Sequence, residues 1–211
     1  MDDRDPLTRQ YFNGRVDFDA PDLFTLGGQL LDTRFAAKLT GAPDGSRIVM
    51  HLDEHGAGFE IHNSKMFARK AEFQLHAFNA GGFILLAKER LELRDTFQNQ
   101  GIGLRMFAQQ AFAALDAGVS QIWLTALRAR AYNGYYAWAR YGFDAELDWI
   151  HKQSFPPAFQ GVRTLSELMA TADGRNVWRA HGMTVDMCFE LNDPRYFLAL
   201  GDYLRVKGVT L

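Results

Sequence analysis

Hydrophobic and polar positions alternate along two parts of the chain's first half, and turn-forming residues interrupt each part once. The first part covers residues 46–62, with the interruption around 53–58. The second consists of residues 71–78 and 81–93, separated by Asn-Ala-Gly-Gly at 79–82. A period of two is typical of half-buried strands, and short polar interruptions are typical of hairpin turns. We therefore expect two β-hairpins.

Helical spacing of apolar residues occurs before and after these hairpins. It predicts a helix over residues 22–39 and a second over residues 101–117, ended by Gly118. A nearly continuous apolar stretch follows at 121–127, as expected of a buried parallel strand. Strand 81–93, the second helix and this last strand together predict a βαβ unit.

The last third of the chain adds mainly helices. One is expected over residues 131–141, closed by Gly142, another near 164–173, and a last one over 194–207. A strand is expected at 184–191. With the hairpins and the βαβ unit, this order of elements predicts an α/β or α+β fold with a mixed sheet.

Composition narrows the class of protein. The chain has 211 residues, 47% of them hydrophobic, so we expect one globular domain over residues 1–211. A net charge of −2 offers no electrostatic basis for binding nucleic acid. The opening MDDRDPLTRQ is too polar for a secretory signal, and the absence of an 18-residue apolar run argues against membrane association. Cys188 is the only cysteine, which excludes an internal disulfide and fits the reducing cytoplasm.

Two glycines, Gly101 and Gly103, stand where the helix after strand 81–93 should begin. Glycine is a poor helix former, but it lets a ligand approach the unpaired N–H groups of a helix start, where the dipole attracts anions. The pair indicates either a phosphate or pyrophosphate site, or a turn that packs the helix tightly on its strand. A P-loop would continue with Gly-Lys-Ser/Thr, and a dinucleotide fingerprint would need a third glycine where Met106 stands.

The spacing Gln98-x-x-Gly101-x-Gly103 resembles the Gln/Arg-x-x-Gly-x-Gly/Ala signature of the GNAT superfamily of N-acyltransferases. In that superfamily the signature holds the pyrophosphate of coenzyme A. The chemistry that the resemblance implies therefore agrees with the anion site that the glycines indicate.

Two flanking segments extend this resemblance. ERLELRDTFQNQGIG resembles the family's strand 4, with Leu91 and Leu93 before the glycines, and NGYYAWARYGF resembles a helix that ends in Gly142-Phe143. The resemblance is good over about residues 81–145. It implies a recognisable core over about residues 45–145, with residues 146–211 completing the sheet and adding helices.

Membership of the superfamily implies a mixed, mostly antiparallel sheet that splays between its strands 4 and 5, here residues 81–93 and 121–127. The donor, acetyl-CoA or a longer acyl-CoA, would lie in the splay. Its pantetheine arm would pair with the strand's backbone as an added strand would, and its pyrophosphate would contact the loop amides. The residues implied in donor binding are Leu91, Glu92, Leu93, Gln98, Asn99, Gln100, Gly101, Ile102, Gly103, Leu104, Arg105, Asn133 and Tyr136.

Acyl transfer to an amine needs a base for the ammonium and an acid for the leaving thiolate. Glu89 is the first candidate base, because strict alternation places it on an apolar face, although it could equally pair with a neighbouring cation. A bulge, which strand 4 of the family often carries, would bring Glu92 forward instead. The family's usual acid is a tyrosine four residues before the Gly-Phe, and Trp138 stands there. Tyr136 or Tyr141, or the nearby Tyr135, could substitute; otherwise the thiolate leaves without an acid, or this copy is weakly active or inactive.

The acceptor is expected to be an amine of a small molecule, peptide or protein, and no metal is expected to take part. His51, His55 and His62 lie in a predicted hairpin rather than on the helix that the HExxH zinc motif requires. The tryptophans and the extra segment 146–183 fit either an apolar channel for a longer acyl chain or an enlarged core. The last helix could also pack on a second subunit, which leaves a homodimer open.

Two other functions are compatible with the same residues. Trp138, at the position of the family's acid, favours a non-catalytic acyl-CoA-binding or sensor module. An acyltransferase that takes its donor from an acyl-carrier protein would use the same loop for a phosphopantetheine arm.

Overall fold

The structure is a computed structural model. It describes the placement of residues 3–20, 25–26, 29–53, 56–78, 83–129 and 132–211. The chain divides into two compact units, the first made of Met1–Ile122 and Leu204–Leu211 and the second of Trp123–Tyr203. Helices and strands occur in both, so the chain belongs to the mixed α/β class.

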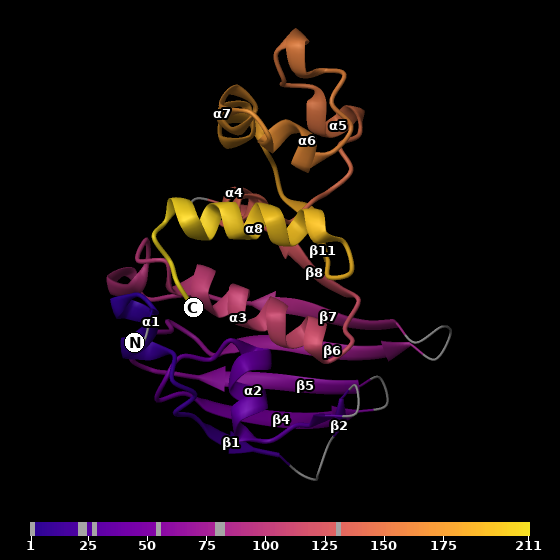
Figure 1. The fold of residues 1–211 in the computed structure, drawn as a ribbon. Helices are drawn as coiled ribbons and strands as arrows, with labels where there is room; N and C mark the ends of the chain where they lie inside the picture. The colour runs from indigo at the N-terminus through magenta and orange to yellow at the C-terminus, as the bar shows by residue number, and fades with distance from the viewer. Residues whose placement is uncertain (1–2, 21–24, 27–28, 54–55, 79–82, 130–131) are drawn as a thin grey trace. The chain divides into compact units, whose positions relative to one another are not determined.

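The first unit is built on a sheet with the strands β1 (Asp17–Asp19), β4 (Arg47–Asp53), β5 (Gly56–His62), β6 (Ala71–Phe78) and β7 (Phe83–Arg90). They follow the order β1-β4-β5-β6-β7 (Figure 1). β1 runs parallel to β4, and the other three pairs are antiparallel. The sheet is therefore mixed and mostly antiparallel, and both predicted hairpins, β4–β5 and β6–β7, are confirmed.

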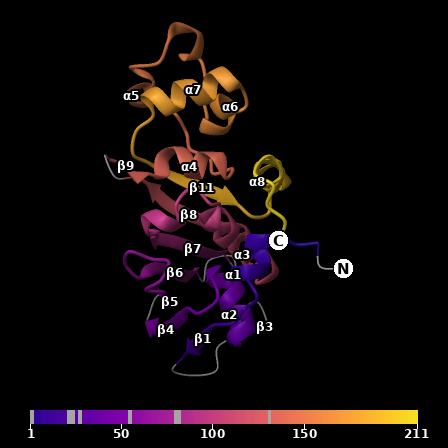
Figure 2. The same ribbon diagram turned by 90° about the vertical axis from the view of Figure 1, so that its left-hand side faces the viewer.

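Helices of the first unit lie on one face of this sheet. They are α1 (Pro6–Tyr11), α2 (Thr33–Thr40), the 3₁₀ helix η1 (Asp95–Phe97) and α3 (Ile102–Asp116). Figures 1 and 2 show α2 and α3 along the same side of the strands. The pairing register sets Met50 opposite Phe59 and Phe59 opposite Phe73, all buried, so every second strand residue contributes to the core.

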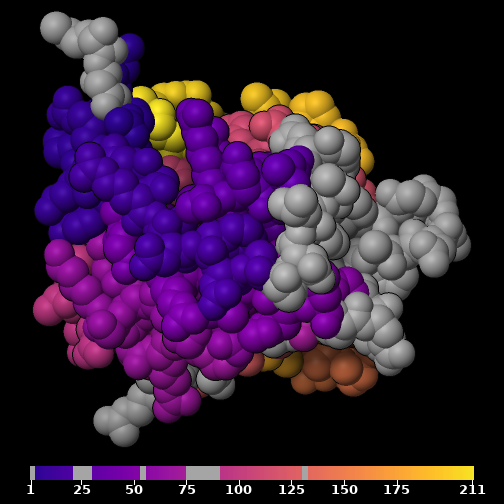
Figure 3. Space-filling model, turned by 90° about the horizontal axis from the view of Figure 1, so that it is seen from below, coloured from indigo at the N-terminus to yellow at the C-terminus, as the bar shows by residue number. Residues whose placement is uncertain are grey.

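β1 lies at the edge of the sheet and is short. It contributes three residues, of which Asp17 and Asp19 are exposed. The view of the molecule from below, onto this edge, shows mainly indigo and purple atoms of the chain's first third (Figure 3). This edge is therefore closed by a brief, acidic strand.

The second unit combines four strands with several helices. Its elements are the end of β8 (Gln121–Ala126), β9 (Arg128–Ala129), β10 (Tyr132–Asn133), α4 (Gly134–Arg140), α5 (Trp149–Lys152), the 3₁₀ helix η2 (Pro157–Phe159), α6 (Leu165–Met169), α7 (Ala172–His181), β11 (Val185–Glu190) and most of α8 (Pro194–Val206). β8 and β11 are neighbours, and the Thr125 hydroxyl donates to the Asp186 carboxylate at 2.6 Å. In the described part of the chain, no helix has the length and apolar character needed to cross a bilayer.

One predicted helix is wrong over its first part. Residues 25–26 and 29–30, inside the helix predicted over 22–39, form β2 (Thr25–Leu26) and β3 (Gln29–Leu30), which pair with each other. α2 begins only at Thr33, because the Asp32 carboxylate accepts the Phe35 N–H at 2.7 Å and caps the helix there. Residues 21–24 and 27–28 lie outside the described residues.

The segment near residues 164–173, predicted as one helix, contains a break between two helices. α6 and α7 each start with their own threonine cap, because the Thr164 hydroxyl accepts the Glu167 N–H at 3.2 Å and the Thr171 hydroxyl accepts the Gly174 N–H at 3.0 Å. A second cap inside the predicted span ends one helix and starts another.

Candidate functional site

The segment at residues 98–104, called the glycine loop below, connects η1 to α3. Its backbone has positive φ at two residues, Asn99 (60°) and Gly101 (74°). Gly101 occupies the N-cap position of α3, and without a side chain it cannot cap the helix. α3, a helix of fifteen residues, therefore begins uncapped.

The first main-chain N–H groups of α3 have no acceptor among the described residues. Across the described residues, no group accepts a hydrogen bond from the N–H of Ile102, Gly103 or Leu104. The next N–H along the chain, that of Arg105, donates to the Gly101 carbonyl at 3.0 Å. Consecutive unpaired donors at a helix start attract an anion, and the helix dipole adds to the attraction. The loop thus has the chemistry of an anion-binding site.

The Arg105 side chain, which the sequence assigns to donor binding, is buried beneath the loop with 4% of its surface exposed. Its guanidinium donates to the Asp5 carboxylate at 2.6 Å and to the Thr8 hydroxyl at 3.0 Å. It also donates to the Gln100 carbonyl at 3.1 Å. Arg105 therefore contacts the loop from inside the protein.

β7 carries an irregularity close to its end. Arg90 pairs with Glu72 and Lys88 with Phe73, so Glu89 is an extra residue that the partner strand does not match. This is the arrangement of a β-bulge. It interrupts the strict alternation that places Glu89 on an apolar face, and the Glu89 side chain lies outside the described residues.

Beyond β7 the chain still runs beside residues 66–68. The Glu92 carbonyl accepts the Ala68 N–H at 3.0 Å, and the Arg94 N–H donates to the Met66 carbonyl at 2.8 Å. Because backbone groups alternate in direction along an extended chain, those of Leu91 and Leu93 point to the opposite edge.

That opposite edge keeps unpaired donors. No group in the described part of the chain accepts from the N–H of Leu91 or Leu93. The Leu93 carbonyl accepts from the Gln98 side chain at 2.9 Å, and Gln98 also donates to the Asp95 carboxylate at 3.1 Å. The structure therefore brings the predicted residues 91–93 and the glycine loop together through Gln98.

The carboxylate of Glu92 lies 3.8 Å from the Arg69 Nε. The two side chains are 31% and 63% exposed. Solvent screens such a pair, so it contributes little to stability.

The remaining predicted site residues lie on or next to α4 in the second unit. The Tyr136 hydroxyl accepts a hydrogen bond from the Arg179 guanidinium at 3.1 Å. Trp138, at the position of the family's acid, packs edge-on against Tyr141, with ring centroids 5.2 Å apart. Burial raises the pKa of the Tyr141 phenol well above its usual range, and the neighbouring Tyr203 raises that pKa further. The exposed Asn133 precedes the helix without capping it.

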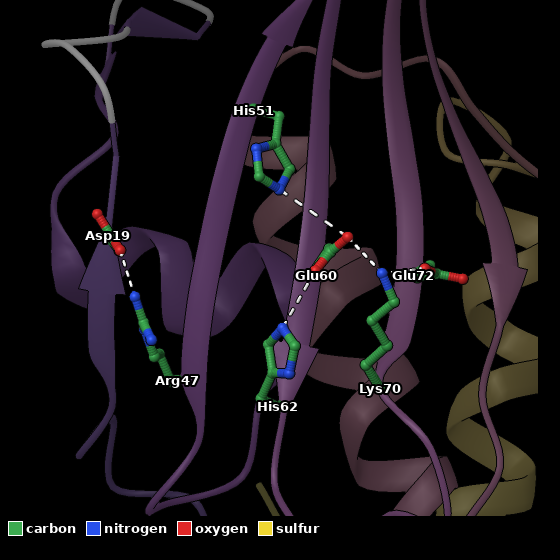
Figure 4. A network of polar contacts seen from close by, with 7 residues as sticks. All are labelled: Asp19, Arg47, His51, Glu60, His62, Lys70 and Glu72. Atoms are coloured by element: carbon green, nitrogen blue, oxygen red, sulfur yellow. Dashed lines mark hydrogen bonds and ion pairs between the residues drawn. The ribbon is translucent and has the colours of Figure 1, made fainter.

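A network of charged side chains lies on the other face of the first unit's sheet (Figure 4). Glu60 is its centre, with one oxygen 3.1 Å from His62 Nε2 and the other in contact with Lys70 and 3.9 Å from His51 Nε2. Lys70 also binds Glu72 at 2.7 Å. The hydrogen bond from Lys70 is the main reason why the Glu60 pKa is lowered, and burial opposes it. Among the described residues, no group of three or more His, Cys, Asp or Glu is arranged to hold a metal ion.

Two residues that contact the site region from inside, Asp5 and Thr8, were not expected from the sequence. Asp5 is followed by Pro6, and an acidic residue before a proline is a common helix start, so this signal could have found the cap. Nothing in that signal indicates the contact with Arg105, which is 100 residues away in sequence.

In comparisons with known proteins, the sequence matches no family model and no curated protein.

Proposed function

We propose that this chain is an acyl-CoA-dependent N-acyltransferase of the GNAT type and has the fold of that superfamily. The observation that supports this best is the uncapped start of α3, where the N–H groups of Ile102, Gly103 and Leu104 have no partner among the described residues. A diphosphate offers several charged oxygens to such a row of donors. The amides and the dipole would together hold the pyrophosphate of coenzyme A.

The extended segment after β7, at residues 91–93, also supports acyl-CoA as the donor. An extended pantetheine arm carries amide groups, and an extended ligand adds to a free strand edge through main-chain hydrogen bonds. The N–H groups of Leu91 and Leu93 provide such an edge a few residues before the glycine loop. An arm bound there would continue toward a diphosphate on the loop, which is the order of groups in an acyl-CoA.

The proposed reaction joins an amine nitrogen to the acyl carbon of the thioester and breaks the carbon–sulfur bond. The attacking amine loses one proton and the departing thiolate gains one, so the transfer needs a base and an acid. Glu92 or Glu89 is the proposed base. Tyr136 is the proposed acid in preference to Tyr141, because its hydroxyl accepts from Arg179 and keeps its own proton to donate, whereas burial makes Tyr141 a weaker acid.

Calorimetric titration with acetyl-CoA, octanoyl-CoA and palmitoyl-CoA tests the donor site. We expect binding by the wild-type protein and, in Gly103→Glu, an affinity reduced by about 100-fold or more, because a carboxylate at the helix start repels the diphosphate and occupies its place. The matched control is Gly201→Glu, which adds the same side chain at a helical glycine of α8 with open space around it. No binding of any acyl-CoA by the wild type, or equal binding by both variants, would refute the site.

A second candidate function is acyl-CoA binding without transfer. Trp138 favours it, because the indole that stands at the position of the family's acid and packs against Tyr141 has an N–H that is far too weakly acidic to protonate a thiolate. The two functions differ in thiol release. An enzyme liberates free coenzyme A thiol with at least one amine in a panel of small amines and lysine peptides, and Tyr136→Phe lowers that rate. A binding module releases none above the rate of the blank.

A further inference from the structure

A buried polar cluster lies beneath the glycine loop and joins three distant parts of the chain. Asp5 and Thr8 come from the start of α1, Arg105 from α3 and Thr210 from the chain's last residues. The side chains of Arg105 and Asp5 are 4% and 10% exposed, and Thr8 is fully buried. Charged groups at this depth are stable only when they are paired and hydrogen-bonded.

The Asp5 carboxylate is the centre of the cluster. One of its oxygens accepts from the Arg105 guanidinium at 2.6 Å and from the Leu7 N–H at 3.0 Å. The other accepts from the Thr8 hydroxyl at 2.7 Å and the Thr210 N–H at 3.0 Å. The Arg105 Nε donates a further hydrogen bond to the Thr8 hydroxyl oxygen at 3.0 Å. The guanidinium is therefore fixed from two sides.

The third contact of this guanidinium reaches the glycine loop itself. Its Nη1 donates to the Gln100 carbonyl at 3.1 Å. In a trans peptide the carbonyl and the following N–H point in opposite directions, so a Gln100 carbonyl held toward Arg105 turns the Gly101 N–H away from it. The same Nη1 lies 2.7 Å from the place that a Cβ on Gly101 would take. The guanidinium thus fills the space under Gly101 and sets the direction of its N–H.

α1 also contacts the far side of the connection. The Tyr11 ring packs edge-on against Phe97 of η1, with centroids 6.2 Å apart. η1 and the glycine loop are therefore held by the same short helix, through Tyr11 at one end and through Asp5 and Thr8 at the other.

We propose that Arg105 is a positioning residue, which Asp5 and Thr8 hold so that it fixes the glycine loop with its N–H groups turned outward. This deepens the proposed function and rests on it for the ligand, while the shape of the loop is a property of the free protein. Arg105 does not touch the donor. It acts through the Gln100 carbonyl.

Arg105→Lys tests the proposal. A lysine keeps the positive charge beside Asp5, but its single ammonium cannot reproduce three contacts in a fixed fork. We expect a Tm within a few degrees of the wild type, acyl-CoA affinity about tenfold lower, and increased motion of the loop amides. By ¹⁵N relaxation, the order parameters of residues 101–103 should fall from about 0.85 to below about 0.6. The matched control is Arg175→Lys, since Arg175 also donates to carbonyls, those of Met169 and Ala170 at 2.9 and 3.2 Å.

The outcomes separate this proposal from the proposed function. Affinity within twofold of the wild type and unchanged order parameters in Arg105→Lys would overturn the positioning role. If the wild type binds no acyl-CoA, the proposed function fails, and the order parameters of the free protein still decide the role of Arg105. If Arg105→Lys does not fold, Thr8→Val takes its place, because it removes the hydroxyl that holds the guanidinium and should loosen the same residues.

Discussion

Two helix starts in the first unit differ in how their N–H donors are satisfied. At α1, the Asp5 carboxylate accepts from the Leu7 N–H at 3.0 Å and the Thr8 N–H at 3.2 Å, and Pro6 has no N–H to satisfy. At α3, Gly101 offers no side chain, and among the described residues nothing accepts from the amides of the first turn. The chain itself therefore supplies an anion at the start of α1, and the described residues supply none at the start of α3.

The difference carries a cost in stability. An aspartate or serine cap typically stabilises a helix by a few tenths of a kcal/mol relative to a glycine at the same position. α3 lacks that contribution, whereas α1, the shorter of the two helices, has it. The start of α3 therefore depends on packing rather than on a side-chain cap.

Removing the internal anion should have the largest effect. Asp5→Asn leaves the Arg105 guanidinium buried without its counter-charge, and breaking a buried pair in this way costs about 3–5 kcal/mol. For a chain of this size that corresponds to a fall in Tm of roughly 10 °C. Urea unfolding at pH 7 measures the loss of stability.

The exposed pair Asp19–Arg47 is the control, because its oxygen–nitrogen distance is also 2.6 Å while its side chains are 56% and 61% exposed. Asp19→Asn should leave stability unchanged within error. Equal losses in the two variants would contradict the view that the Asp5 cluster is special.

The difference in stability between the wild type and Asp5→Asn should depend on pH in a defined direction. Burial raises the pKa of Asp5, but hydrogen bonds from Arg105, Thr8 and Thr210 outweigh it and hold the pKa well below its ordinary value of 3.8. A lowered pKa in the folded state gives stability that is complete above the ordinary pKa and is lost as the pH falls below it. The gap between wild type and Asp5→Asn should therefore be constant from pH 7 to about pH 5 and shrink below about pH 4. A gap that widens on acidification would exclude this account.

Supplying the external anion should stabilise the protein by a smaller amount. A ligand at 100 times its Kd that binds only the folded state adds about 2.7 kcal/mol. We expect this from an acyl-CoA in the wild type and not in Gly103→Glu, measured as the shift in Tm with ligand concentration. The gain should decrease at high salt, because screening weakens the attraction for the diphosphate. A shift that Gly103→Glu retains would place the ligand elsewhere.

A smaller difference in stability is expected between alanine substitutions at Gly101 and at Gly118, two glycines with the same backbone conformation. Gly101 and Gly118 have φ of 74° and 76°, so alanine at either position meets a strain of about 1–2 kcal/mol. At Gly101 the new methyl group would also meet Arg105 Nη1 at 2.7 Å, while at Gly118 nothing lies within 4 Å. Gly101→Ala should be the less stable variant and should also weaken acyl-CoA binding, whereas Gly118→Ala should leave binding intact. Identical unfolding curves would show that the guanidinium moves aside freely.

Local patterns in the sequence were enough to predict much of the first unit. Alternation found β4 to β7, and the change of period at residue 101 placed α3 and its glycines within one residue. Such features depend on neighbouring residues, and so does the anion-binding chemistry of the loop. The caps are equally local, but Asp32 and Thr171 stood inside spans whose apolar spacing suggested unbroken helices.

Contacts between distant residues could not be predicted in this way. Asp5 and Arg105 are 100 residues apart, and without the fold each is an ordinary surface residue type. The bulge at Glu89 is a mismatch between two strands, and only the family resemblance, not the apolar pattern, suggested that this strand could carry one. Sequence therefore singled out the glycine loop, and only the fold showed that Arg105 contacts it from inside the protein.

The short acidic strand β1 has a consequence for encounters between copies of the protein. A strand at the margin of a sheet presents unpaired backbone groups that can recruit another chain. Three residues offer little length for such pairing, and Asp17 and Asp19 would set their charges against those of any identical strand brought alongside. Edge-to-edge pairing of two identical copies through β1 is therefore unfavourable.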